Sequence, residues 1–442
     1  MANTYLSRTP SSAGNKKTWT WSAWIKRSAL GGTPVVFTNR TDGSNRQYLR
    51  FNSSDQFETY GVVGGTTIIQ ANTTSVFRDV SAFYNVVVAF DTTQGTGSNR
   101  YKVYVNGVQQ SITFTTTPSV NANGSINDNG IHYIGSSTGS GDYFDGAMSH
   151  IHFIDGTAYD ASAFGETDAT TGEWKAKTSP SVTYGTNGFF ILKDGNGITD
   201  QSGEGNNFTL GGGTLTNLKD NPDNNFATLN SLNSWGNTVL TNVNLTAGNT
   251  GTSAGHVSST MHMNSGKWYM EFNVDTHSSG YSAPMFFLAG TGAFQQQQVS
   301  FSNSGDGAYG ISSNGRSITD GAESGSVNIP VLNNGDKVQI AYDADAGKAW
   351  FGINGTYLGS GNPSTGANPY FTSTKLQNND VSFKSIGYQN NAMSANFGNG
   401  YFGTTAITTN SGNGYAGAEG ASKFNYTVPT GYSALSTKGL NE

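Results

Sequence analysis

Asn-Gly and Asp-Gly pairs recur along the whole chain and separate short runs of alternating apolar and polar residues. Six of them are Asn106-Gly107, Asp145-Gly146, Asp155-Gly156, Asn314-Gly315, Asn334-Gly335 and Asn354-Gly355. Asn, Asp and Gly tolerate the positive φ that tight hairpin turns require, so each pair marks a connection between antiparallel strands. Helical periodicity is almost absent, and no repeat of about 20–50 residues occurs. The pattern predicts an all-β chain built of sandwiches.

Composition supports this interpretation and narrows the class of protein. Charged residues make up 12% of the 442 residues, and Gly alone accounts for 59. These values exclude a coiled coil and a charged disordered tail. Aromatic residues also reach 12%, so the chain has the material for a core although Leu and Ile are scarce. The length corresponds to about two to four domains.

Charge and sequence ends exclude several kinds of partner. The net charge is −6, with 23 basic and 29 acidic residues and no run of one sign, so nucleic-acid binding has no support. Cysteine is absent, which removes disulfides and thiol chemistry. The start MANTYLSRTP has no signal-peptide pattern, and the longest apolar run, 86–90, is too short to span a membrane. We expect assembly in a cytoplasm and no membrane partner.

The runs predict four segments along the chain. We expect a first sandwich over 1–195, an Asn/Gly-rich connecting segment over 196–254 that packs on a neighbour, a second sandwich over 255–403, and an extended tail over 404–442. Three aromatic side chains alternate with polar ones in strand-like runs and are expected in cores: Trp19, Trp268 and Phe272. One hairpin is expected to join 336–342 to 348–353.

The first segment resembles the laminin-G-like, concanavalin A-like lectin/glucanase family. The resemblance lies in the order of TWTWSAWIKR, YNVVVAFD, KVYVNGVQQ, HYIGSS and FDGAMSHIHFIDGTAYDASAF. It implies a jelly-roll sandwich. Members of this family often hold calcium with Asp and backbone oxygens, and the resemblance implies a structural calcium here at Asp142, Asp145 and Asp155.

The second sandwich resembles a SPRY domain, which is also concanavalin A-like. KWYMEF resembles the opening strand of that family, GDKVQIAYDADAGKAWFGINGTYLG its central hairpin, and SANFG its closing strand. SPRY-like domains bind through loops at one end of the sandwich. By position, this implies a binding region around 281–298 and 306–317.

Three further stretches resemble virion structural proteins of tailed bacteriophages, especially marine ones. They are YLSRTPSSAGNKKTWTWSAWIKR, DNPDNNFATLN and FNYTVPTGYSAL. The resemblance implies a protein of the virion, assembled in the host cytoplasm, with other tail or capsid proteins as partners. Such assemblies are symmetric, so a homo-oligomer, for instance a trimer, is expected.

Two groups of residues could form a catalytic or metal site, a carboxylate pair and a set of histidines, but each has a simpler structural interpretation. A retaining glycoside hydrolase needs two carboxylates about 5–5.5 Å apart, and Glu166 with Asp168 is the nearest pair, in what we expect to be a solvated loop. His150 and His152 share one face of a strand and His132 lies on a neighbouring run, but two histidines without a third ligand are more often a polar sheet face. We expect no enzyme activity.

Recognition of a ligand is what the remaining residues favour. Sugar sites combine aromatic faces with planar polar groups, and the exposed loop candidates are Tyr143, Tyr281, Gln296 and Tyr309. Glu271 is expected to be a solvent-facing strand residue. The function predicted from the sequence is a non-enzymatic virion appendage (a tail fibre, spike or receptor-binding component) that recognises host-surface glycan. The alternatives are a capsid decoration protein and a polysaccharide-degrading hydrolase.

Overall fold

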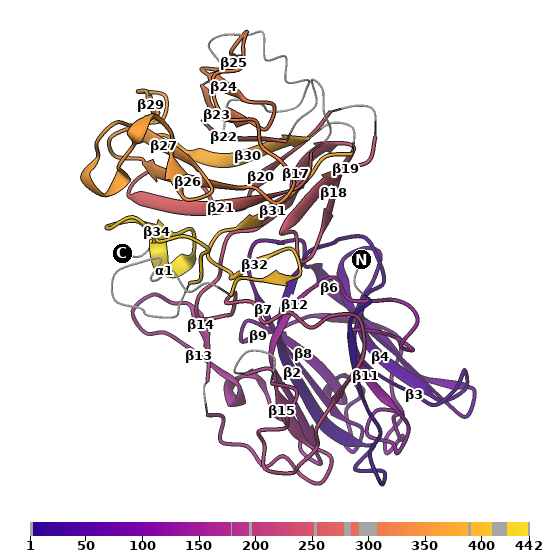
Figure 1. Cartoon of the computed structure of the whole chain (residues 1–442). Helices are drawn as coiled ribbons and strands as arrows, with labels where there is room; N and C mark the ends of the chain where they lie inside the picture. Colours follow the sequence, from indigo (N-terminus) through magenta and orange to yellow (C-terminus); the bar gives the residue numbers. More distant parts are fainter. Residues whose placement is uncertain are drawn as a thin grey trace. The chain divides into compact units, whose positions relative to one another are not determined.

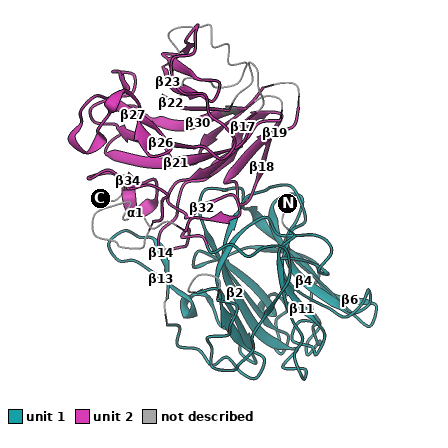
Figure 2. Cartoon of the chain, in the orientation of Figure 1, with its two compact units in different colours: residues 1–217 teal, residues 218–442 magenta. Residues whose placement is uncertain are grey.

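The chain folds into two compact β-rich units, residues 1–217 and 218–442 (Figure 2). The computed structural model describes residues 3–177, 179–193, 197–251, 254–277, 284–290, 307–387, 390–408 and 422–440. In these ranges the regular structure is almost entirely strand, with one short α-helix, α1 (Thr437–Leu440) (Figure 1). None of the helices in the described part of the chain has the length and apolar character that crossing a bilayer requires. The all-β fold class predicted from the sequence is confirmed.

The first unit consists of two sheets. In spatial order, the eight-stranded sheet contains β10 (Ile112–Thr116), β6 (Thr66–Val76), β5 (Gln56–Val63), β4 (Arg46–Phe51), β3 (Val35–Arg40), β11 (His132–Ile134), β1 (Tyr5–Arg8) and β16 (Thr209–Gly212). The six-stranded sheet contains β15 (Phe189–Ile191), β12 (Gly146–Asp155), β2 (Thr18–Arg27), β7 (Tyr84–Asp91), β8 (Tyr101–Val105) and β9 (Val108–Gln109). A small hairpin, β13 (Gly165–Thr167) and β14 (Trp174–Ala176), completes it.

The second unit repeats the two-sheet plan. Its seven-stranded sheet contains β17 (Leu229–Gly236), β20 (Gly255–Ser259), β30 (Val381–Gly387), β22 (Met285–Gly290), β23 (Ala308–Ser312), β24 (Arg316–Thr319) and β25 (Ala322–Glu323). The nine-stranded sheet contains β18 (Thr238–Thr241), β19 (Thr246–Asn249), β31 (Ala392–Asn396), β21 (Lys267–Thr276), β26 (Lys337–Asp343), β27 (Lys348–Ile353) and β28 (Thr356–Tyr357), with β29 (Phe371–Thr372) beside β27 and β34 (Ser433–Ala434) beside β21. β32 (Tyr401–Phe402) and β33 (Thr405–Ala406) form a separate pair.

The predicted turns hold at some Asn-Gly pairs and fail at two Asp-Gly pairs: Gly146 begins β12, and Asp155-Gly156 leads from β12 to a 3₁₀-helix, so neither pair joins two paired strands. Asn106-Gly107 and Asn354-Gly355 both adopt positive φ at each residue, as a two-residue hairpin turn requires. The expected hairpin over 336–353 is β26 and β27, closed by the pair Asp343 and Lys348. The residues predicted for the cores, Trp19, Trp268 and Phe272, are buried.

Residues 196–254, expected to connect the sandwiches, instead supply strands to both units. β16 joins the eight-stranded sheet next to β1, whereas β17, β18 and β19 join the sheets of the second unit. Three apolar side chains of this segment are fully or nearly fully buried: Phe208, Phe226 and Leu229. Backbone pairing and these side chains fix the segment.

Residues 422–436, here called the C-terminal strap, cover the outer face of the nine-stranded sheet. Phe424 and Tyr432 pack against Tyr269 and Trp350 in a small second core. β34 within the strap pairs in parallel with β21. The described part of the C-terminal segment contains turns, the short strand β34 and α1, and it belongs to the second unit.

Glu271 fixes the strap, and the prediction that it faces solvent is wrong. Its side chain is 0% exposed. Its carboxylate accepts hydrogen bonds from the backbone N–H groups of Asn425 and Tyr426, both at 2.7 Å, and from the Tyr269 hydroxyl at 2.9 Å. Glu271 does point away from the core between the sheets, as alternation with Met270 and Phe272 requires, but the strap lies over that face. Burial raises the pKa of Glu271 to about 7, against the effect of these donors.

We expect ionisation of Glu271 to destabilise the second unit as the pH rises from about 5 to about 8. The ordinary pKa of the Glu271 carboxyl is 4.5 and its native pKa is about 7, so between these values the native state binds more protons than the unfolded state. This contribution is fully present below the first pKa and is lost above the second. It corresponds to about 3 kcal/mol in the free energy of unfolding.

Hydrogen–deuterium exchange of peptides from β21 and the strap, corrected for intrinsic rates, measures this change. The variant Glu271→Gln, which cannot ionise, is the control and should lose most of the pH dependence. Burial lowers the pKa of His132 to about 3 and that of His152 well below its usual value. Both lie in the first unit, whereas His256 and His262, whose pKa values burial also lowers, lie in the second. All four act with the opposite sign, so the difference between wild type and variant in these peptides measures the part due to Glu271. Equal pH responses of wild type and variant would contradict the assignment to Glu271.

Candidate functional site

The outer face of the eight-stranded sheet carries a row of half-buried tyrosines. In β4 and β5 every second side chain enters the core, among them Leu49, Phe51 and Phe57, all 0% exposed. Because successive strand residues point to opposite faces, Tyr48 and Tyr60 lie on the other side. They face each other across the two strands with ring centroids 5.5 Å apart and planes inclined by 27°.

The row continues across the neighbouring strands through directly opposed residues. Tyr60 is opposite Gln70 on β6, Tyr48 is opposite Thr38 on β3, and Thr38 is opposite Tyr133 on β11. Strands lie about 4.8 Å apart, so the six strands from β6 to β1 give the row a length of about 24 Å. Thr38 is fully buried, so its larger neighbours close over it.

Tyr5 and Tyr143 extend the row at the β1 end. The Tyr5 ring meets Tyr133 edge-on at 5.8 Å and lies 6.3 Å from the ring of Tyr143. Tyr5 fits because Gly211 has no side chain: a Cβ there would lie 2.1 Å from the ring. The Tyr143 hydroxyl donates to the Gly139 carbonyl oxygen at 2.9 Å. We call Tyr5, Tyr48, Tyr60, Tyr133 and Tyr143 the tyrosine platform.

Charged and amide side chains surround the rings. Arg50 forms an ion pair with Glu58 at 2.7 Å, and its guanidinium lies 4.7 Å from the centre of the Tyr48 ring. The Arg46 guanidinium lies 5.5 Å from the centre of the Tyr60 ring. Burial raises the pKa of Tyr133 above its usual value, so its hydroxyl stays protonated at neutral pH. Aromatic faces ringed by planar polar groups suit the binding of sugars.

Sequence reasoning identified Tyr143 in this group and missed the rest. The signal was present in RQYLRF and QFETYGVV, where tyrosine alternates with core residues. That the two runs are adjacent, in the register that stacks Tyr48 on Tyr60, follows only from the sheet order and pairing.

The three aspartates predicted to hold calcium are not gathered into one group. Asp155 binds Asn15 N–H at 2.8 Å, Asn127 Nδ2 at 2.6 Å and Asn187 N–H at 3.2 Å. Asp142 accepts a hydrogen bond from the Thr33 hydroxyl at 3.2 Å. Burial raises the pKa of Asp145. In the described ranges no set of three or more His, Cys, Asp or Glu is placed to hold a metal ion.

The binding region predicted for the second sandwich lies partly outside the described residues. Tyr281 and Gln296 lie outside the described residues. Tyr309 was expected in an exposed loop, and this is wrong: it lies in β23, is 6% exposed, and its hydroxyl is 2.8 Å from that of Ser373. Tyr309 lies two residues before Ile311 in β23 and shares its core-facing side, so its ring is part of the core.

The histidines of β12 are buried, contrary to the expected polar sheet face. A bulge between Ser149 and His152 shifts the register, and the His152 ring stacks on Phe190 at 3.9 Å. His152 Nδ1 lies 2.9 Å from the Tyr184 hydroxyl. His132 lies in β11 of the eight-stranded sheet, where its ring packs on Phe37 of β3. It accepts a hydrogen bond from Asn127 N–H at 3.1 Å. These imidazoles have structural partners.

Glu166 and Asp168, the carboxylate pair considered for glycoside hydrolysis, lie in the β13–β14 hairpin. Glu166 is an exposed strand residue, so this segment has the strand character that the sequence did not indicate. Asp168 Oδ1 accepts the N–H groups of Thr170 and Thr171, both at 2.9 Å, and Oδ2 pairs with Lys175 at 2.8 Å. These bonds lower the pKa of Asp168. Its carboxylate is used in closing the turn.

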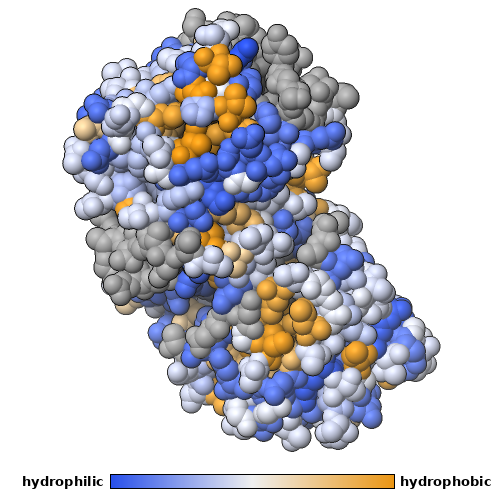
Figure 3. All heavy atoms as spheres, viewed as in Figure 1, coloured by the Kyte–Doolittle hydropathy of each residue, from blue (hydrophilic) through white to orange (hydrophobic). Residues whose placement is uncertain are grey.

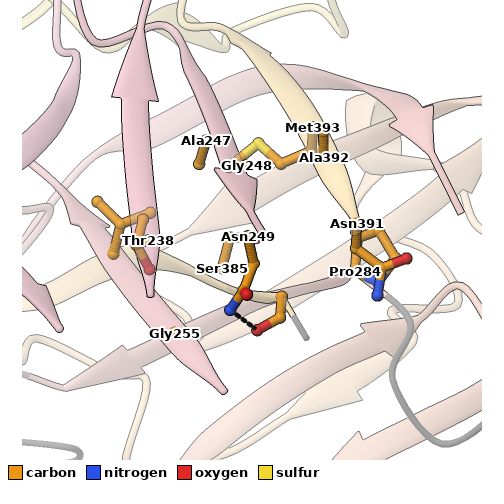
Figure 4. Close-up of a pocket in the computed structure, with 12 residues that line it drawn as sticks. Thr238, Ala247, Gly248, Asn249, Gly255, Pro284, Ser385, Asn391, Ala392 and Met393 are labelled. Carbon is orange, nitrogen blue, oxygen red and sulfur yellow. Dashed lines mark hydrogen bonds between the residues drawn. The ribbon is translucent and has the colours of Figure 1, made fainter. Parts of the chain in front are cut away.

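The second unit has a small hollow, open to solvent, between β18, β19 and β31 on one side and β20 and β30 on the other (Figure 4). Thr238, Ser385 and Asn391 contribute polar atoms, and Asn249 Nδ2 donates to the Gly387 carbonyl oxygen at 2.9 Å. The residues that line it include no carboxylate, imidazole or amine. The hollow offers no acid–base chemistry and much less aromatic surface than the platform.

Hydrophobic side chains do not form the platform's surface. On the face shown in Figure 3, hydrophilic residues predominate and hydrophobic residues gather in a patch on each unit. The large apolar side chains that are exposed in the described ranges are Val76, Val108, Val120, Leu210, Leu232, Trp235, Val239, Val327, Val331 and Leu440. None of them belongs to the row of tyrosines.

A protein-family model matches most of the first unit. A laminin-G-type model, described as the concanavalin A-like lectin/glucanases superfamily, matches residues 2–163. This range contains every residue of the tyrosine platform. The laminin-G-like resemblance of the first segment is thereby confirmed. A search among curated proteins gives no match.

Solved structures of low sequence identity are similar to parts of the chain. The SPRY domain of human HERC1 is 12% identical over 38% of this chain and 96% of that domain, with a TM-score of 0.30. A putative carbohydrate binding protein from Bacteroides ovatus is 17% identical over 48% of this chain and 60% of its own, with a TM-score of 0.29. A heptameric SAP-like pentraxin from Limulus polyphemus is 17% identical over 35% and 71%, with a TM-score of 0.26.

We expect a calcium chelator to leave the thermal midpoint of the protein unchanged, and Asp155→Asn to lower it. An amide at position 155 replaces one of the two acceptor oxygens by an NH2 group, which then faces at least one of the three N–H donors and costs about 1–3 kcal/mol. Asp142→Asn, at an exposed aspartate with one hydrogen bond, is the matched control and should have little effect. Differential scanning calorimetry with and without calcium measures both. A midpoint that rises with calcium in the wild type but not in Asp142→Asn would establish the calcium site instead.

Proposed function

We propose that the chain is a non-enzymatic carbohydrate-binding protein and that it binds an extended glycan along the tyrosine platform. The observation that carries this proposal is the row of half-exposed rings on one sheet face, stacked in part and flanked by guanidinium, carboxylate and amide groups. Sugar rings have apolar C–H faces that pack on aromatic rings and hydroxyls that bond to planar polar side chains. The platform offers both in alternation.

The shape of the platform supports a chain-like ligand. Its tyrosines lie on successive strands and not around one closed cavity, so a single small molecule would touch only part of it. Partners such as Gln70 and Asn72 on β6 stand beside Tyr60 and Glu58 and supply amide donors and acceptors. The superfamily that the first unit matches includes lectins and glucanases by its description, which agrees with a glycan as ligand.

The non-enzymatic part of the proposal rests on the carboxylates. Retaining and inverting hydrolases both place two carboxyl groups on either side of the scissile bond. Among the described strand residues that share a sheet face with the tyrosine platform, the carboxylate is that of Glu58, and it is paired with Arg50 at 2.7 Å. Asp168, the other half of the pair considered from the sequence, is bonded within its own turn.

We further propose that the protein is a virion appendage of a tailed phage and that its glycan is on the host surface. The support is the resemblance of the stretches at 5–27, 220–230 and 424–435 to phage structural proteins. Other virion proteins would be its partners, in a homo-oligomer such as a trimer, assembled in the host cytoplasm. A platform left free on the particle suits receptor binding better than capsid decoration, which would cover it.

Immunogold labelling of purified phage particles with an antibody to this chain tests the location. We expect gold at the tail. Labelling spread over the head would replace the appendage by a decoration protein, and unlabelled intact particles would contradict the virion proposal while leaving glycan binding open to the test below.

We expect Tyr48→Ala and Tyr60→Ala each to weaken glycan binding about tenfold or more, because each removes an aromatic face at the centre of the row. Tyr48→Phe keeps the face and should stay within about threefold of the wild type. A glycan array identifies the ligand, and titration calorimetry with the full chain then measures the dissociation constants.

Two controls accompany these variants. Trp235→Ala removes an aromatic ring that is 37% exposed in the second unit, and it should leave binding unchanged. Thermal midpoints show whether each variant remains folded. Unaltered binding by both folded tyrosine variants would contradict the platform as the site. Release of reducing ends from the bound polysaccharide by the wild type would contradict the non-enzymatic assignment.

A further inference from the structure

Two arginines face each other directly across β3 and β4 at the edge of the tyrosine platform. Arg40 and Arg46 form the last cross-strand pair before the turn at 41–45. Arg46 shares the outer face with Tyr60, over whose ring its guanidinium lies. Arg40 follows Thr38 by two residues and therefore points to the same face. Like charges directly opposed on neighbouring strands destabilise a sheet.

Within the described ranges neither guanidinium forms an ion pair. The nearby carboxylates are engaged elsewhere: Glu58 pairs with Arg50, and Asp42 at the turn accepts the N–H groups of Ser44 and Asn45, both at 2.7 Å. The hydrogen bonds from Ser44 and Asn45 lower the pKa of Asp42, and the positive charge of Arg40 contributes a minor part of this lowering. The Arg46 guanidinium lies over the Tyr60 ring.

The platform is thus cationic on a chain that is anionic overall. The net charge of the whole chain is −6, whereas the charged side chains on this sheet face are Arg40, Arg46, Arg50 and Glu58. Directly opposed side chains have Cβ atoms about 4.5–5.5 Å apart. In the free protein the Arg46 guanidinium lies over the Tyr60 ring. From Cβ atoms at that spacing, two long arginine side chains can turn their donors toward one oxyanion between them, and the guanidinium fork suits carboxylate and sulfate.

We propose that the glycan bound on the platform is acidic, and that a carboxylate or sulfate on one of its sugars sits between Arg40 and Arg46. The inference rests on the proposed glycan-binding function and adds the class of sugar. Neutral sugars would pack on the Tyr48 and Tyr60 rings, and the charged sugar would lie beside them toward the turn at 41–45. The repulsion between the two arginines in the free protein is relieved when the anion binds.

The experiment compares the full chain and its variants on an array of neutral, uronic-acid and sulfated polysaccharides. Each acidic member is accompanied by its carboxyl-reduced or desulfated counterpart, which keeps the same sugar backbone. We expect binding to acidic members, loss of binding after removal of the anion, and about tenfold weaker binding by Arg40→Gln and by Arg46→Gln. Which treatment abolishes binding distinguishes a carboxylate from a sulfate. Raising the salt concentration should weaken the wild type more than either variant.

Lys102→Gln removes the same charge from β8 in the other sheet and should leave binding unchanged. Binding that survives removal of the anion and is unaffected in both arginine variants, but is lost in Tyr48→Ala, would overturn the acidic-glycan proposal and retain the glycan-binding function. Absence of binding to every member of the array would count against both.

A stability measurement tests the premise without any ligand. Relief of the repulsion should raise the thermal midpoint of Arg40→Gln and Arg46→Gln at low salt, and the difference should shrink at high salt. A lower midpoint in both variants would show that the guanidinium groups stabilise the free sheet, and would contradict the proposal that they await an anion.

Discussion

Packing of the tryptophan strand β2 against the inner face of the eight-stranded sheet determines which side of every strand in the first unit meets solvent. Trp19 and Trp21 are both 0% exposed. Trp19 stacks on Phe90 at 5.0 Å within its own sheet, and Trp21 stacks on Phe37 of β3 at 6.2 Å across the sandwich. Because strand side chains alternate, a slip of one residue would exchange the core and the surface. The tyrosine platform exists because Leu49, Phe51 and Phe57 occupy the inner positions.

Both units consist of two large sheets, but the outer face of the larger sheet differs between them. In the first unit the outer face of the large sheet carries half-exposed rings and charges. In the second, the outer face of the nine-stranded sheet is covered by the C-terminal strap, whose rings pack with Tyr269 and Trp350. A polar group at the centre of such a covered face must be satisfied by hydrogen bonds, and Glu271 is satisfied by Asn425, Tyr426 and Tyr269. Outward strand positions therefore carry half-exposed rings and charges in one unit and a buried, hydrogen-bonded carboxylate in the other.

The charges on the platform have a different role from those elsewhere in the first unit. Arg27 is buried and paired with Asp55 at 2.9 Å, so that pair holds loops together. Arg40 and Arg46 are partly exposed and directly opposed, an arrangement that costs stability in the free protein and gains its use with an anionic ligand. Proteins commonly place such locally unfavourable groups where they bind.

The sequence by itself determined the fold class, some of the turns and much of the core, because these depend on local rules: a two-residue period, and turn residues that tolerate positive φ. It placed the hairpin of β26 and β27, the Asn106-Gly107 turn and the burial of Trp19, Trp268 and Phe272. It could not place what depends on partners distant in the chain. Glu271 was expected to face solvent, but it lies under a strap that is more than 150 residues later in the sequence. Tyr309 was expected in a loop, but its ring lies in the core of the second unit. The stacking of Tyr48 on Tyr60, the approach of Tyr5 to Tyr143 and the opposition of Arg40 and Arg46 were decided by strand order and register, which only the tertiary structure fixes.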